Sequence, residues 1–126
     1  MWMSFLAVSA GAVVGANLRW LLGLWLNASH HVIPLGTLAA NLSGGWLVGL
    51  LLGYFSHSST LAPEWRLFVI TGLCGALTTF STFSVEVLAA IQGGKWAVAM
   101  TGVAVHVAGS VLMTALGLYT FSLMKG

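Results

Sequence analysis

The sequence predicts an all-α membrane protein with four transmembrane helices in each subunit. Of its 126 residues, 59% are hydrophobic and 5% carry a charge. A soluble domain carries charge on roughly 25% of its residues, so this chain cannot cover a surface that faces water. The apolar residues fall into four stretches, each long enough for the roughly 20 residues that cross a bilayer. We therefore expect one domain, residues 1–126, almost wholly embedded in lipid.

The four spans are expected at residues 3–26, 34–55, 66–92 and 96–124. Residues that favour turns separate them: Asn27 and Pro34 in the first gap, a Ser-rich stretch at 56–63 in the second, and Gly93-Gly94 in the third. No Lys or Arg precedes the first apolar stretch, whereas a secretory signal carries positive charge there. We expect this stretch to remain in the protein as its first span.

The charged residues exclude several classes of function. The chain has four cations and two acids, too few to form the basic surface that binds nucleic acid. Its single cysteine, Cys74, lies in an apolar stretch, where it cannot form an intrachain disulfide or by itself bind a metal. We interpret Cys74 as a small packing residue.

The few cations are balanced across the membrane. If the spans alternate in direction, Arg66 and Lys125 lie on one side and Arg19 and Lys95 on the other. The Lys and Arg excess that normally fixes orientation is then absent. Such a chain can insert both ways round, which is compatible with an antiparallel homodimer. So few charges would also balance by chance, and the charges alone leave both explanations open.

Glycines recur at helical spacing. Gly11 and Gly15 are four residues apart, and so are Gly45, Gly49 and Gly53. Rows of small residues let membrane helices approach closely, so these glycines predict a tightly packed bundle.

Polar residues inside the spans also follow helical spacing. Intramembrane polar groups are costly unless they face the bundle interior or a watery cavity, and they mark functional sites by default. Three or four residues separate the members of each set, so each set lies along one side of its helix. The sets are Thr37 and Asn41 in the second span and His106, Ser110 and Thr114 in the fourth. In the third span they are three pairs, Phe80 with Phe83, Ser81 with Ser84, and Thr82 with Glu86.

The chemistry of these sets favours an anion. A cation pathway usually carries rings of carboxylates, whereas these residues are mostly hydrogen-bond donors. Donors solvate anions, and the edge of a Phe ring is the positive part of its quadrupole. Without a fixed charge, such groups replace the water around a small, strongly hydrated anion without holding it too tightly for conduction.

Each set also has a structural explanation that the residues leave open. Ser and Thr hydroxyls in membrane helices often bond to a carbonyl one turn earlier. Asn41 could join two helices, and His106 could be a buried histidine with satisfied partners. Phe80 and Phe83 could be ordinary core residues.

The stretch "GALTT" at 75–79 weakens the third helix near mid-membrane. Broken membrane helices are tolerated where protein or water satisfies the freed backbone groups. Carbonyls exposed at such a break can hold a cation such as Na⁺. An unbroken helix with a packing glycine is the alternative that the residues leave open.

Four segments together resemble one family, the Fluc (CrcB) fluoride channels. They are "GAVVGANLRW" (11–20), "PLGTLAANLSGGWLVG" (34–49), "TGLCGALTTFSTFSVE" (71–86) and "HVAGSVLMTALG" (106–117). The resemblance covers essentially the whole chain in order, and its most specific parts are "TTFSTFS" and the Asn of the second span. It implies an antiparallel, dual-topology homodimer with two fluoride pores in the bacterial plasma (inner) membrane, with fluoride, lipid and a second copy as partners and no nucleic acid.

The resemblance also implies roles for particular residues. A fluoride pore would be lined by Asn41, Phe80, Phe83 and Ser110. A polar track of hydroxyls leading to an acid would comprise Thr37, Ser81, Thr82, Ser84, Thr114 and Glu86.

Further roles follow for residues outside the pore lining. Arg19 would attract anions at an entrance, and a structural Na⁺ between the subunits would be held by the backbone carbonyls of Gly75 and Thr78. His106 has no assigned role in the family pattern, but it shares a helix face with Ser110 and is expected beside the pore.

Two other functions fit a small apolar chain. A dual-topology multidrug exporter needs an acid deep in a span, whereas the first span here carries Arg19 and no acid, and Glu86 lies toward the end of the third. A scaffold protein would use Asn41 and Phe80 for assembly only. No nucleophile–base pair or metal cluster stands out, so we do not expect an enzyme.

Overall fold

The protein is a bundle of four long helices. The computed structural model describes residues 1–28, 32–58 and 60–126, and every regular element within them is helical. The spans are α1 (Trp2–Leu26), α2 (Leu35–His57), a composite third helix (Pro63–Gln92) and α6 (Trp96–Lys125). The expected all-α fold with four membrane-length helices is confirmed.

The third span is a series of short elements. It comprises α3 (Pro63–Arg66), the π-helical η1 (Leu67–Cys74), α4 (Gly75–Leu77) and α5 (Phe80–Gln92). Between α4 and α5, Thr78 and Thr79 are extended, with φ/ψ of −81°/153° and −149°/122°. The expected break is confirmed; it falls three residues after Gly75, at the two threonines. π-Helical turns are rare and are found mostly at functional sites. The π-helical segment η1, which precedes the break, therefore points to this part of the third span as a candidate site.

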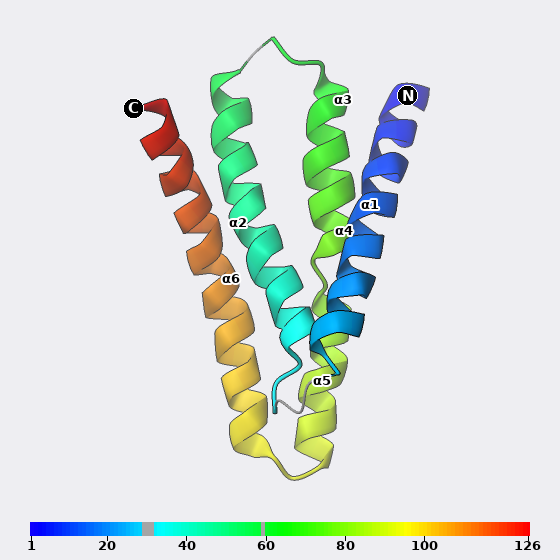
Figure 1. Cartoon of the computed structure of the whole chain (residues 1–126), viewed down its shortest axis with the longest axis vertical. Helices are drawn as coiled ribbons and strands as arrows, with labels where there is room; N and C mark the ends of the chain where they lie inside the picture. Colours follow the sequence, from blue (N-terminus) through cyan, green and yellow to red (C-terminus); the bar gives the residue numbers. More distant parts are fainter. Residues whose placement is uncertain (29–31, 59) are drawn as a thin grey trace.

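The helices lie side by side in the order α6, α2, third span, α1, with both termini at one end of the bundle (Figure 1). An even number of spans requires this placement of the termini. The α5–α6 loop lies at the opposite end and extends beyond the ends of α1 and α2. The closest pairs are α2 with α6 and α1 with η1, and α5 packs on α6.

Glycines make both close helix pairs possible. A Cβ added to Gly49 would overlap the carbonyl oxygen of Thr114, and one on Gly117 would overlap that of Trp46. In the other pair, a Cβ on Gly11 would overlap the carbonyl oxygen of Phe68. These backbones therefore touch without side chains between them, as the glycine spacing predicts.

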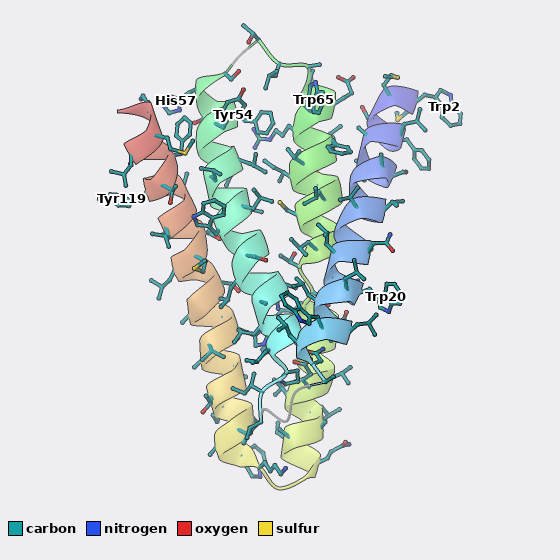
Figure 2. The ribbon with its side chains drawn as sticks, in the orientation of Figure 1. Trp2, Trp20, Tyr54, His57, Trp65 and Tyr119 are labelled. Carbon is teal, nitrogen blue, oxygen red and sulfur yellow. The ribbon has the colours of Figure 1, made fainter. Side chains whose placement is uncertain are left out.

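Aromatic side chains mark the two ends of the membrane-embedded part. Trp2, Tyr54 and Trp65 lie near the end that holds the termini (Figure 2), and Trp96 begins α6 at the other end. Trp and Tyr favour the boundary between lipid and water. At that other end, Gly94 has φ +74° and ends α5, because the amides of Gly94 and Lys95 bond back to the carbonyls of Ile91 and Ala90.

Candidate functional site

The Asn41 side chain is joined to the break in the third span. Its Nδ2 donates to the carbonyl oxygen of Thr79 at 3.0 Å, and its Oδ1 accepts from the amide of Thr79 at 2.7 Å. The Asn41 side chain thereby replaces the backbone partners that Thr79 would have in a continuous helix. This pair satisfies two of the freed backbone groups, as a break within lipid requires.

Arg19 holds the other side of the break. Its Nε donates to the carbonyl oxygen of Ala76 at 3.0 Å. In a continuous helix this carbonyl would accept from the amide of Phe80, four residues later. Side chains from α1 and α2 thus bond to three of the backbone groups that the break leaves open, the Ala76 carbonyl and the amide and carbonyl of Thr79.

A cavity of about 340 Å³ lies beside the break, and most of the expected pore residues line it. The cavity brings together residues from α2, the third span and α6. They are Asn41, Thr78, Thr79, Phe80, Phe83, His106, Val107, Ser110 and Val111.

Three rings in the lining of this cavity, those of Phe80, Phe83 and His106, contact one another in series. The Phe80 and Phe83 rings meet edge to face, with centroids 5.3 Å apart and planes at 74°. The Phe83 ring lies against that of His106, with centroids 4.5 Å apart. Phe83 is buried, whereas 74% of Phe80 is exposed on the surface of the subunit. The two Phe residues therefore lie together, but on one subunit only Phe83 is enclosed.

A second cavity, of about 330 Å³, extends from these rings toward the α5–α6 loop. Phe83 and His106 line both cavities, and Glu86 and Lys95 line only the second. The Thr37 hydroxyl donates to Oε2 of Glu86 at 2.5 Å, so the acid is tied to the start of α2. The second cavity thus joins the buried rings to an exposed cation at the end of the bundle.

Arg19 lines a third cavity, of about 210 Å³, together with Thr37, Thr79 and Thr82. Asn27 also lines it, and its Oδ1 accepts from the amides of Gly36 and Thr37 at 2.7 and 3.3 Å. Asn27 therefore caps the first turn of α2 and fixes the backbone that carries Thr37.

The hydroxyls of the expected polar track have different partners. Ser84 donates to the carbonyl of Phe80, and Thr114 donates to the carbonyl of Ser110, each one turn earlier. Ser81 shares a hydrogen bond with Thr79. In the described part of the chain, the Ser110 hydroxyl has no partner. The hydroxyls of Ser84 and Thr114 are therefore bonded within their own helices, whereas Ser110 lines the first cavity with a hydroxyl that has no such bond among the described residues.

Helical spacing alone does not single out three residues of this site. Thr79 binds Asn41 through its backbone, Asn27 caps α2, and Lys95 lies at the mouth of the second cavity. The sequence marked Asn27 as a turn residue, Thr79 as part of the weak stretch 75–79 and Lys95 as the cation between the third and fourth spans, but it did not show that the three lie at this site.

The groups of this site that could hold a metal ion are backbone carbonyl oxygens. Among the described residues, no group of three His, Cys, Asp or Glu side chains could hold a metal. The Thr79 amide, which would bond to the Gly75 carbonyl in a continuous helix, instead donates to Asn41. A Cβ on Gly75 would meet only the Ile70 carbonyl oxygen, at 3.7 Å, so the space beside Gly75 is open. Neutral carbonyl oxygens of this kind suit a hard cation.

Four apolar helices, a broken third span and donor-lined cavities beside the break define a multi-pass membrane protein of the class that conducts or carries small ions. The family model described as "CrcB-like protein, Camphor Resistance (CrcB)" matches residues 6–118. The chain belongs to this family, and the resemblance found in its sequence is confirmed.

Close relatives carry one name, fluoride-specific ion channel FluC. The protein is 70% identical to the one from Marinobacter nauticus over 126 residues, which are all of both chains. It is 58% identical to the one from Chromohalobacter salexigens over 125 residues, 99% of this chain and 95% of that one. It is 56% identical to the one from Pseudomonas putida over 126 residues, 100% and 99% of the two chains.

These relatives are named as channels and not as enzymes, in agreement with the expectation for this chain. They come from bacteria, and the chain has four apolar helices of membrane length. The protein is therefore a multi-pass protein of the bacterial plasma membrane.

Proposed function

We propose that the protein is a fluoride-selective channel through which fluoride leaves a bacterial cell passively. The relatives named as fluoride channels match the whole chain. Fluoride enters cells as neutral HF and dissociates inside, so an open path for the anion removes it without a further energy source. The chain's own residues support the same function.

The observation that carries the proposal is the lining of the 340 Å³ cavity. Ser110 offers a hydroxyl donor there. The lining also holds the Asn41 amide, whose two hydrogens bond to Thr79 and His106, and the rings of Phe80 and Phe83. No carboxylate lines this cavity among the described residues, and a fixed negative charge would repel an anion. Neutral donors bind an anion firmly enough to dehydrate it and weakly enough to release it.

The functional unit that we propose is an antiparallel homodimer with two pores. Phe80, Val107 and Val111 line the cavity and are exposed, so one subunit leaves the lining open on one side. A second copy related by a two-fold axis in the membrane plane would close both cavities at once. The balance of Arg19 and Lys95 against Arg66 and Lys125 removes the bias that would prevent opposite insertion.

We further propose a structural Na⁺ on that axis, held by the carbonyls of Gly75 and Thr78 from both copies. Both residues lie at the break, and the Gly75 carbonyl is released from its helical bond because Asn41 takes the Thr79 amide. A bound cation would neutralise carbonyl dipoles between the subunits. Arg19 and Asn41 keep the backbone in the conformation that exposes them.

Ion efflux from liposomes that contain the purified protein tests the function. A fluoride electrode follows release while a potassium ionophore balances charge, and chloride-loaded liposomes are the control. Fast fluoride release with little chloride release is the expected result. Retention of fluoride, with uptake of a cationic dye driven by a proton gradient, would replace the channel with a multidrug exporter.

A further inference from the structure

The break in the third span fixes the orientation of the Asn41 amide. The Thr79 amide can only donate, so the atom of Asn41 that lies 2.7 Å from it is the oxygen. The other end of the side chain is therefore the NH₂ group, which has two hydrogens to donate. One goes to the carbonyl of Thr79 at 3.0 Å, and the other points to Nδ1 of His106 at 2.9 Å.

This contact fixes the protonation of His106. The Asn41 nitrogen cannot accept, so Nδ1 of His106 must be the acceptor and carries no proton. An imidazolium ring would place a second donor against the Asn41 NH₂ group. The ring is therefore neutral, and its proton is on Nε2.

The Nε2–H group is a buried donor without a partner. His106 is only 4% exposed, and Nε2 has no hydrogen-bond partner among residues 1–28, 32–58 and 60–126. Buried donors are almost always paired, because an unpaired one loses its bonds to water and gains nothing. The ring is oriented by one hydrogen bond from Asn41, which is itself held by two hydrogen bonds to Thr79. The unpaired Nε2–H is therefore available to a guest.

The position of His106 indicates the guest. The ring lines both the 340 Å³ cavity beside the break and the 330 Å³ cavity that leads to Lys95. It lies against Phe83, and Ser110 follows one helical turn later, with a hydroxyl that also has no partner among the described residues. Phe83 and His106 line both cavities, so anything that passes between the cavities meets these two rings.

We propose that His106, held in its neutral Nε2–H tautomer by Asn41, donates a hydrogen bond to the permeating anion where the two cavities meet. This inference rests on the proposed fluoride channel. A neutral N–H binds a strong acceptor such as fluoride better than a weak acceptor such as chloride, and it adds no fixed charge. His106 thus contributes to the choice of anion, and Asn41 acts on the anion through the ring that it orients.

Nitrogen NMR of the ¹⁵N-histidine-labelled protein in lipid bilayers tests the tautomer directly. The His106 signals are assigned by their absence in His106→Gln. We expect an unprotonated Nδ1 and a protonated Nε2, and a shift of the Nε2–H signal when sodium fluoride, but not sodium chloride, is added. A protonated Nδ1 would overturn the inference. So would an Nε2–H that exchanges with water but does not respond to fluoride, since water would then be the guest.

Fluoride efflux from liposomes tests the consequence. We expect His106→Leu to slow efflux about tenfold or more, the effect of losing a hydrogen bond to a charged group, and His106→Gln to retain most of it. His57→Leu is the control, since His57 lies at the other end of the bundle beside Lys125 and should leave efflux unchanged. Equal efflux from wild type and His106→Leu would overturn the role of His106 and leave the channel intact. No efflux from the wild type would overturn the channel, while the NMR tautomer would still be measured.

Discussion

Asn41 and Thr79 are joined by two hydrogen bonds, one from the Asn41 Nδ2 to the Thr79 carbonyl and one from the Thr79 amide to the Asn41 Oδ1. A single side chain of α2 thus satisfies both backbone groups of one residue at the break. The same side chain lines the cavity beside the break and contacts His106. The conformation of the break and the orientation of the His106 ring therefore depend on one amide.

Replacing Asn41 with Asp should abolish fluoride efflux. The carboxylate still accepts from the Thr79 amide, but it cannot donate to the Thr79 carbonyl or to His106, and it places a negative charge on the proposed path. Efflux is measured in liposomes with a fluoride electrode, and size-exclusion chromatography checks that the variant is folded. Undiminished efflux from a folded Asn41→Asp protein would remove Asn41 from the pore.

Replacing Arg19 with Lys separates two roles of this residue. Lys keeps the positive charge that would attract anions but lacks the Nε–H that donates to the Ala76 carbonyl. We expect the free energy of unfolding to fall by about 1–2 kcal/mol and efflux to fall with it, because the break loses one of its two supports. Thermal unfolding and efflux are measured together, with Arg19→Gln as the comparison. Normal stability and efflux in Arg19→Lys, with loss in Arg19→Gln, would show that the charge alone matters.

Much of the fold could be predicted because it follows from local patterns. The apolar stretches predicted the four helices. The close helix contacts were predicted by the spacing of two rows of glycines, Gly11 and Gly15, and Gly45, Gly49 and Gly53. The break also could be anticipated, since it required only a glycine and two threonines in mid-membrane.

The partners of the polar side chains could not be predicted, because they depend on how distant segments meet. Arg19 and Ala76 are 57 residues apart in the chain, and Asn41 and His106 are 65 apart. The spacing placed Ser110 and Thr114 on one helix face. It did not show that the Thr114 hydroxyl donates its hydrogen bond to the carbonyl of Ser110. Helical periodicity reports which way a residue faces and not whether its donor is free.

Two glycine substitutions test the contact between α2 and α6. In Gly49→Ala the added methyl group overlaps the Thr114 carbonyl oxygen, so the helices must separate. Such overpacking costs about 1–3 kcal/mol, and we expect a lower melting temperature and a lower yield of folded protein. Gly102→Ala is the matched control, because its nearest neighbour would be Val87 Cγ2 at 4.0 Å. Alanine favours a helix over glycine by up to about 1 kcal/mol, so this variant should be as stable as the wild type or more so. A Gly49→Ala protein as stable as Gly102→Ala would contradict the close contact.

Lys95 should raise the rate at which fluoride reaches the second cavity. It is exposed at the mouth of that cavity, where its charge draws anions toward Glu86 and His106. We expect Lys95→Gln to reduce fluoride efflux several-fold at low ionic strength, and the difference to vanish in high salt, because the screening length falls from about 30 Å at 0.01 M to about 3 Å at 1 M. Lys125→Gln removes the same charge from the other end of the bundle, where Lys125 donates to His57, and should leave efflux unchanged. An equal loss in both variants would indicate a general effect of net charge, and no loss in either would exclude Lys95 from anion attraction.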